Sequence, residues 1–269
     1  MPNPLNTPFL SCSIWVLRFS LCLTALSAAS LLDLRRREVP DALWLLSGPP
    51  LAVLTALWLL RNPGYLTLVV FSLLTTLALA AAIYFTGIMG GADSKALVLI
   101  AVACPTDSPW ALLESHPFTP LASFSNALVL TALLSASLLI YNLAWRMKTG
   151  LPLFEGIRAS RAARALALLS GFKARTSEVL SGRRHLFPLE VLAEDGSREL
   201  SIALGLDLLY DRLEALREAS RRGAGLPEYM WVSPGLPMVL FITAGFVMAC
   251  FLGDLLFSAL SFLFGLLAP

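Results

Sequence analysis

The chain has 269 residues, of which 57% are hydrophobic and only 14% charged, and its mean hydropathy is +0.74. An ordinary soluble domain carries about 25% charged residues, so this composition excludes a typical soluble enzyme. The apolar residues stand in long tracts without charge, which a water-soluble core of this size could not bury. The chain is therefore expected to be a polytopic membrane protein.

Charge-free tracts predict where the chain crosses the membrane. A helix needs about 20 apolar residues to cross the hydrocarbon layer. The tracts that could hold one span each are 42–60, 62–92, 117–145 and 229–253. Two further spans are expected at 14–32, where Arg18 would reach the near interface with its long side chain, and at 92–113. The pattern therefore predicts six spans.

The last hydrophobic region, 236–267, is too long for one upright span. Asp254 interrupts this region, and Gly253 and Gly265 offer places for a bend. Asp254 is either an acid with a role inside the membrane or, as its position favours, a residue at the outer end of the sixth span.

Basic residues give the expected orientation, because cytoplasmic loops carry an excess of Lys and Arg. Arg35, Arg36 and Arg37 follow the first span, Lys95 lies at the start of the fourth, and 14 of the 20 basic residues lie in 146–222. With six spans, these regions share one side of the cell membrane, which is expected to be the cytoplasmic side. Both termini are then expected on the outer side. Since topology accounts for the basic residues, the net charge of +2 does not point to nucleic acid, and the expected surroundings are the lipid bilayer.

Three regions follow from this pattern. Residues 1–145 are expected to form the membrane bundle with spans one to five. Residues 146–235 are expected to form a cytoplasmic soluble module, and residues 236–269 the sixth span with a hydrophobic tail. The predicted fold class is an all-α polytopic membrane bundle of six transmembrane helices, with a small α+β insertion between helices five and six. Within the module, strands are expected at 186–192 and 199–203 around the turn Asp195–Gly196, followed by a helix over 207–222 that Asp207 caps.

Two acidic residues at span ends are the candidates for chemistry. Asp33 closes the first span in DLRRREVPD (Asp33–Asp41), and Asp93 opens the fourth in GGADSK (Gly90–Lys95). The expected topology brings both to the cytoplasmic end of their spans, where they face each other if those spans are neighbours. Two close carboxyl groups can share a proton, so that one is an acid while the other takes a proton from water that attacks a peptide carbonyl. This is the chemistry of an aspartic protease.

Each neighbouring residue also has a structural interpretation. Asp93 could cap the fourth helix, with Gly90 and Gly91 making the turn rather than clearing space for an extended substrate backbone. Lys95 could orient Asp93, or serve only the distribution of positive charge. Asp41 could attract a basic substrate, although its position after a proline favours a cap of the second span.

No residue pattern indicates a cofactor or a metal. Four cysteines are scattered without a CxxC pair and are expected to be small packing residues, and the two histidines stand isolated. These residues are Cys12, Cys22, Cys104, Cys250, His116 and His185.

At the two aspartates the sequence resembles a known family. GGADSK is similar to the GxGD motif of membrane aspartic proteases, with Ala92 in place of the second glycine, and DLRRREVPD resembles the first-aspartate region of type IV prepilin peptidases and archaeal preflagellin peptidases. VSPGLP (Val232–Pro237) resembles the archaeal branch, and the six-span layout with its insertion extends the resemblance over most of the chain. The cysteine-rich zinc region of the bacterial enzymes is missing, which also favours the archaeal branch.

The resemblance implies that Asp33 and Asp93 are the catalytic pair. Gly90, Gly91 and Lys95, next to Asp93, are the candidate substrate-binding residues. The implied reaction removes short basic leader peptides from preflagellins or pilin-like precursors at the cytoplasmic face of the membrane, with no cofactor and no metal.

Other functions would use the same acids or none. A small ion- or proton-coupled transporter would use Asp33 and Asp93 near the middle of the membrane, whereas these residues lie beside polar or basic residues at span ends. A presenilin-like protease that cuts within the bilayer fits this boundary position less well. A scaffold organised by the soluble module would need neither aspartate.

Overall fold

The structure is a computed structural model that describes residues 8–87, 89–113, 115–182, 186–192, 197–200, 206–223, 225–235 and 237–267. It divides into two compact units. The first holds the described residues of 1–131 and 237–269, and the second those of 132–236.

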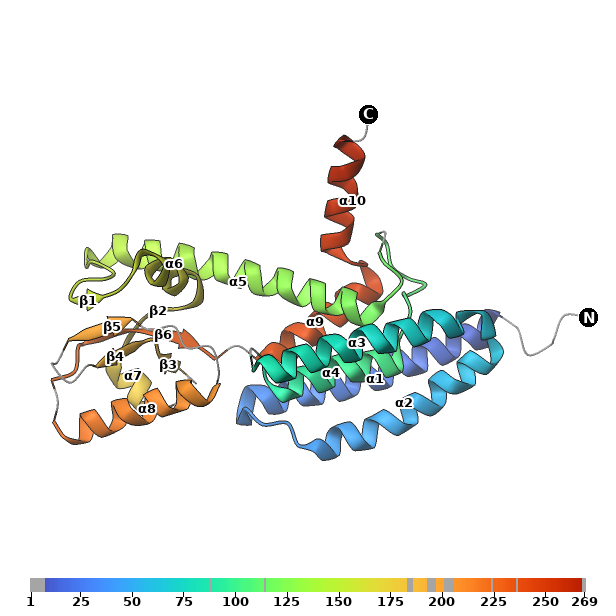
Figure 1. The fold of residues 1–269 in the computed structure, drawn as a ribbon, viewed down its shortest axis with the longest axis horizontal. Helices are drawn as coiled ribbons and strands as arrows, with labels where there is room; N and C mark the ends of the chain where they lie inside the picture. Colours follow the sequence, from blue (N-terminus) through green and yellow to red (C-terminus); the bar gives the residue numbers. More distant parts are fainter. Residues whose placement is uncertain are drawn as a thin grey trace, which may run out of the picture. The chain divides into compact units, whose positions relative to one another are not determined.

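The first unit is built from helices (Figure 1). Their bounds are α1 (Pro8–Arg36), α2 (Asp41–Arg61), the short 3₁₀ helix η1 (Pro63–Tyr65), α3 (Leu66–Thr86), α4 (Gly91–Ala103), α5 (Thr119–Thr149), α9 (Met238–Phe251) and α10 (Leu255–Leu267). The helix α5 begins in this unit and continues into the second. In the described part of the chain, four helices are long and apolar enough to cross a membrane, or up to five when the bent pair α9–α10 forms one span. The protein is thus a multi-pass membrane protein, but the count of six spans is not confirmed.

The fourth predicted span accounts for the lower count. Its helix α4 has 13 residues, which corresponds to about 20 Å, whereas the hydrocarbon layer is about 30 Å thick. The helix ends at Ala103 because Pro105 disfavours helical geometry at the residue before it, and Pro109 follows. The next stretch instead bonds to the end of α9, where the N–H groups of Leu112 and Leu113 donate to main-chain carbonyls.

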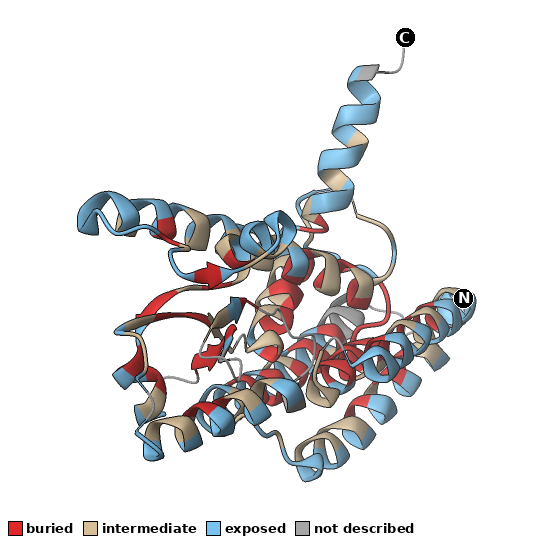
Figure 2. Ribbon diagram, turned by 60° about the vertical axis from the view of Figure 1, so that its left-hand side comes forward, coloured by how far each residue is buried: buried red, intermediate tan, exposed pale blue. Residues whose placement is uncertain are grey.

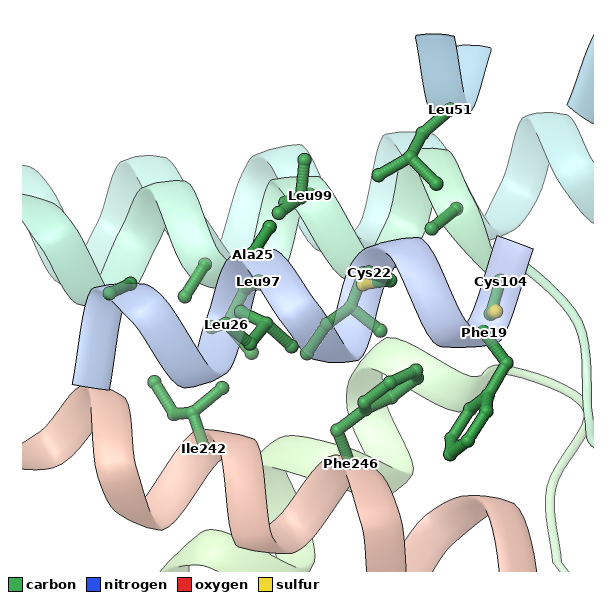
Figure 3. Close-up of a cluster of buried hydrophobic side chains, with 14 of the residues drawn as sticks. Phe19, Cys22, Ala25, Leu26, Leu51, Leu97, Leu99, Cys104, Ile242 and Phe246 are labelled. Atoms are coloured by element: carbon green, nitrogen blue, oxygen red, sulfur yellow. The ribbon is translucent and has the colours of Figure 1, made fainter. Parts of the chain in front are cut away.

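The core of the first unit lies around α4. This helix contacts α1, α2, α3 and α9, and α1 also packs against α2 and α9. Figure 3 shows the buried side chains where these helices meet, with Leu26 of α1, Leu97 of α4 and Phe246 of α9 among them. Cys22 and Cys104 lie in the same cluster as buried, unpaired thiols, in agreement with a packing role.

Arg18 is buried inside the bundle. It is only 1% exposed and lies in the first half of α1. Its guanidinium lies 4.6 Å from the centre of the Trp58 ring, and Nη1 donates to Thr55 Oγ1 at 3.4 Å. The neighbouring helix α2 therefore supplies an aromatic face and a hydroxyl, which hold the side chain inside the bundle.

The last hydrophobic region bends by 52° between α9 and α10. Gly253 sits at the break with φ +96°, and a Cβ there would lie 2.7 Å from the Leu113 carbonyl oxygen, so only glycine fits. The expected bend at Gly253 is confirmed, whereas Gly265 lies inside α10. Figure 2 shows that α10 is exposed along most of its length.

The second unit is a small α+β module, with two three-stranded sheets in the described residues. The strands are β1 (Ile157–Arg158), β2 (Phe172–Arg175), β3 (Leu186–Pro188), β4 (Glu190–Leu192), β5 (Arg198–Leu200) and β6 (Tyr229–Pro234), with the helices α6 (Arg161–Ser170), α7 (Thr176–Ser181) and α8 (Leu206–Arg221). One sheet has the order β1-β5-β4 and the other β2-β6-β3, and all pairs are antiparallel except β1 with β5.

Three sequence-based predictions for this module need correction or refinement. The strand expected at 186–192 is split at Leu189 into β3 and β4, which belong to different sheets. The antiparallel pair β4–β5 agrees with the expected hairpin, whose turn, 195–196, lies outside the described residues. The helix α8 begins at Leu206, so Asp207 lies within it and not before it. Finally, no strand was predicted at Tyr229–Pro234, the start of the charge-free tract 229–253, but these residues form β6, because a buried strand and a span are equally apolar over so short a stretch.

Candidate active site

Asp33 lies in the last turn of α1. The N–H of Arg37, the residue after the helix, donates to the Asp33 carbonyl at 3.0 Å, and Arg37 has φ +58°. This left-handed residue ends α1 and turns the chain toward α2. The side chain of Asp33 is half-buried. The end of the helix thus fixes the backbone from which the Asp33 carboxyl group projects.

Asp93 lies in the first turn of α4 and is only 5% exposed. Its Oδ2 accepts a hydrogen bond of 2.8 Å from the Gly90 N–H, the backbone donor at the start of the helix. This is half of a capping box, the arrangement in which the third helical residue bonds back to the cap. The expected capping role of Asp93 is therefore present. It uses one carboxylate oxygen only, and Oδ1 has no hydrogen bond within the described chain.

The two carboxyl groups are close enough to interact electrostatically, although 60 positions separate them in sequence. They come from α1 and α4, which contact each other. Like charges at short range repel, so such a pair favours one shared proton. The end of α1 and the start of α4 therefore carry two carboxyl groups that interact, which is what an acid and a base in one site require.

Gly90 and Gly91 provide space at this site rather than an unusual backbone. Gly90 has φ −69° and ψ 154°, an extended geometry that any residue adopts. A Cβ at Gly90 would stand 3.4 Å from Asp93 Oδ2, and one at Gly91 would stand 3.6 Å from the Tyr84 ring. A side chain at position 90 would therefore contact the Asp93 carboxyl group, whereas one at position 91 would contact Tyr84.

Lys95 makes an ion pair with Asp41, at 2.5 Å between Nζ and Oδ1. Both side chains are largely exposed, and the pair links α4 to the start of α2. Asp41 is the first residue of α2, with Pro40 in the capping position, so the expected cap by Asp41 is wrong. Lys95 therefore bridges α4 and α2 at an exposed position, and its ion-pair partner is Asp41 and not Asp93.

A pocket between α2 and α4 was not anticipated from the sequence. It has a volume of about 240 Å³ and lies between α2 and α4, with Trp44 and Gly48 on one side and Ser94 and Val98 on the other. Recognising it requires knowing which faces of α2 and α4 meet, and the nearly uniform apolar composition of these helices hides that information. The only available signal was the serine directly after Asp93.

Asp254 and His116 form a second polar cluster, away from the aspartate pair in sequence. His116 Nε2 lies 3.1 Å from Asp254 Oδ2, and Asp254 Oδ1 accepts hydrogen bonds from Ser125 Oγ and from the N–H groups of Leu256 and Phe257. His116 is thus not isolated, as the sequence had indicated, and Asp254 caps α10 at the break. His185 lies outside the described residues. Across the described ranges, no group of three His, Cys, Asp or Glu side chains is placed to hold a metal ion.

Comparison with known families gives two matches. Residues 20–145 match the model of the type IV leader peptidase family, peptidase A24, and residues 163–255 match that of the archaeal peptidase A24 C-terminus, type II. The first match contains both Asp33 and Asp93, and the second covers most of the α+β module. None of the curated proteins compared with the chain matches it.

Proposed function

Since the chain belongs to the type IV leader peptidase family, we propose that it is an aspartic endopeptidase that removes short basic leaders from preflagellins or other pilin-like precursors. The family implies a peptidase with prepilin-like substrates and does not favour an ion- or proton-coupled transporter. The archaeal C-terminal match supports preflagellins among the possible substrates. Asp33 and Asp93 are the proposed catalytic residues, and no cofactor or metal is needed.

The observation that supports this proposal is that Asp33 and Asp93 lie on two contacting helices and interact electrostatically. One acid ends α1 and the other begins α4, and the two interact across the contact between these helices. The buried Asp93 keeps one oxygen free of hydrogen bonds to the chain while the Gly90 N–H orients the other. A water molecule held between two such groups is a nucleophile once the ionised one takes its proton.

The proposed reaction needs only these two groups and water. The ionised carboxylate takes a proton from the water, the oxygen attacks the scissile carbonyl, and the protonated carboxyl group donates its proton to the carbonyl oxygen. As the intermediate collapses, the C–N bond breaks and the new amine receives a proton from the carboxyl group that had accepted it from water. At the same time one hydroxyl group of the intermediate returns its proton to the other carboxylate, and the product carbonyl forms. The protonation of the pair is then restored, so one shared proton supports repeated turnover.

We further propose six spans with both termini outside and the soluble module cytoplasmic. The distribution of basic residues supports this orientation, because Arg35–Arg37, Lys95 and most others fall on one side. In this arrangement α4 crosses part of the bilayer and the residues that follow it, up to Leu113, complete the fourth crossing. Single cysteines introduced at Leu151 and at Leu112 into a cysteine-free background would test it, because only the first should react from the cytoplasm. Reaction of both from the same side would contradict the six-span topology.

The experiment for the catalytic pair uses membranes that contain wild type, Asp33→Asn or Asp93→Asn together with a candidate preflagellin, and follows the size of the product. Each substitution should lower the cleavage rate by at least about 100-fold, because a neutral amide cannot exchange the proton. Asn at position 93 still accepts the Gly90 hydrogen bond, so it preserves the cap while removing the acid.

Asp107→Asn is the matched control, since this aspartate belongs to the same unit and its side chain is exposed. It should cleave at the wild-type rate. Asp93→Asn with normal activity would show that Asp93 only caps α4, and wild-type membranes that cleave no precursor would contradict the proposed function itself.

A further inference from the structure

The helix α6 of the soluble module has an apolar face that its own module does not cover. Its inner side is formed around Ala167, which is fully buried, and the helix packs against β6. The exposed residues on its other side include two alanines and two leucines, namely Ala162, Ala165, Leu166 and Leu169. Their spacing of three, four and seven residues places them on one face of the helix. A helix on the surface of a soluble domain normally has polar residues in these positions.

The charged residues of α6 are all basic. Arg161 and Arg164 are both exposed, and helical spacing places them on one edge of the apolar face. The first turn of the helix contains no acidic residue. A basic residue at the start of a helix meets the positive end of the helix dipole, so Arg161 does not stabilise α6. The arginines instead present positive charge to the surroundings of the helix.

The module has a basic and an acidic part along the chain. Residues 146–175, with the end of α5, α6 and β2, carry seven basic residues and one acidic residue. Residues 176–228 carry seven basic and ten acidic residues. The amphipathic helix α8 belongs to this acidic part and exposes Asp211, Glu214 and Glu218. A negatively charged surface would therefore attract the part with α6 and not the part with α8.

The last part of α5 has the features of a span that leaves the membrane. The helix has 31 residues, about 46 Å, whereas the hydrocarbon layer is about 30 Å thick. Tyr141 and Trp145 are followed by Arg146 and Lys148 near its end. Aromatic and basic residues in this order are typical of the boundary between a span and the cytoplasm. The stretch 141–148 therefore marks the level of the membrane surface.

Hydrogen bonds fix α6 to this stretch of α5. Asn142 is 0% exposed, and its Nδ2 donates to the carbonyl oxygens of Leu168 at 3.2 Å and Gly171 at 2.8 Å. These carbonyls belong to the end of α6, where a helix leaves such groups without partners of its own. Since Asn142 and α6 belong to the same compact unit, α6 lies at the level where α5 reaches the membrane surface.

We propose that α6 lies on the bilayer surface and binds anionic lipid. Leu166 and Leu169 enter the layer between the headgroups, and Arg161 and Arg164 reach the lipid phosphates with their long side chains. A protein partner would also cover an apolar face, but the level of α6 and the surrounding excess of positive charge favour the bilayer. The proposal rests on the membrane spans and not on the peptidase activity.

The test uses a spin label at Ala165→Cys in the full chain, on a cysteine-free background. The protein is reconstituted in vesicles of phosphatidylcholine, with or without phosphatidylglycerol, and the access of oxygen and of a water-soluble nickel chelate to the label is measured. In anionic vesicles the label should be open to oxygen, which concentrates in the bilayer, and protected from the chelate. Ala215→Cys on α8 is the matched control, since this alanine is also exposed, and it should stay open to the chelate in both kinds of vesicle.

The arginines are tested with Arg161→Gln/Arg164→Gln. Each basic residue near an anionic surface changes binding about fivefold, so this variant should lower the ratio of inserted to water-exposed label about 25-fold. Arg221→Gln/Arg222→Gln removes two exposed arginines at the end of α8 and should leave the ratio unchanged.

The leucines are tested with Leu166→Ser/Leu169→Ser, which should lower the same ratio by at least about tenfold. Leu208→Ser is the control, because this leucine of α8 is exposed to a similar degree. A ratio that survives both the arginine and the leucine variants would overturn the proposal.

The two kinds of vesicle separate the possible occupants of this face. Protection from the chelate in anionic vesicles alone supports the proposal. Access of the chelate in both overturns it, and so does equal protection in both, because the lipid charge would then have no role. Protection from oxygen and chelate together would identify a protein cover, such as a second copy, and would also overturn it. No step measures cleavage, so failure of the proposed peptidase function would leave the result unaffected.

Discussion

Gly245 is the position where the bundle tolerates least change. It lies on α9, and a Cβ there would stand 2.2 Å from the Ser123 carbonyl oxygen and 2.9 Å from the Ala127 nitrogen, both backbone atoms of α5. Ordinary contact begins at 3.4 Å, so Gly245→Ala forces α5 and α9 apart by about 1 Å. Overpacking of a dense core costs about 1–3 kcal/mol, and the upper end is expected because backbone cannot move aside as a side chain does.

The consequence should extend to the aspartate pair. The helix α9 contacts both α1 and α4, the helices that carry Asp33 and Asp93. Gly245→Ala should therefore lower both the thermal unfolding midpoint in mild detergent and the cleavage rate of a preflagellin. Gly265→Ala is the control, because that Cβ meets nothing within 4 Å and alanine favours a helix by up to about 1 kcal/mol. If the two variants are equally stable, the close approach of α5 and α9 is refuted.

Three further predictions concern buried charge. Arg18→Met should leave the thermal unfolding midpoint unchanged or raise it. No carboxylate of the described chain pairs with this guanidinium, so methionine removes the cost of burying an unpaired charge. A clear fall in the unfolding midpoint would contradict this reasoning. Burial raises the pKa of Glu190 above its ordinary value of 4.5, although the Trp231 N–H and a nearby arginine oppose this shift. The folded module therefore binds the proton more tightly than the unfolded chain, and it should lose stability as the pH rises from 4.5 through the raised pKa. Glu190→Gln should remove this slope, as read by amide exchange at Trp231 in the full chain, and a retained slope would refute the assignment. Asp254→Ala should cost about 1 kcal/mol in detergent unfolding through loss of the α10 cap, whereas Asp254→Asn, which keeps an acceptor, should cost less; equal losses would contradict the capping role.

The sequence was sufficient where a single property decides the structure. Long apolar tracts predicted α1, α2, α3 and α5, because length and hydropathy alone decide a full-length span. The sequence was insufficient where one residue decides the end of a helix within an apolar tract. Pro105 is such a residue, because it disfavours helical geometry at the residue before it and α4 ends at Ala103. The strand at 229–234 was missed for a related reason, since its partners β2 and β3 come from distant parts of the chain.

The candidate site divides in the same way. Charged residues are scarce in the spans, so Asp33 and Asp93 could be singled out by elimination, and their catalytic role stays a prediction. The pocket between α2 and α4 could not be predicted, because it depends on which faces of these two helices meet. A contact between faces of two apolar helices leaves no periodic signal in either sequence.

The capping role of Asp93 and its proposed catalytic role support each other. From the sequence these were alternatives, but a carboxylate has two oxygens, and the Gly90 N–H occupies only Oδ2. That hydrogen bond fixes the side chain at the start of α4, and the contacts of α4 with four other helices fix the helix itself. A catalytic group must be held in place by its surroundings before substrate arrives. The cap is therefore compatible with the proposed catalytic role, because it orients the Asp93 carboxyl group and occupies only one of its two oxygens.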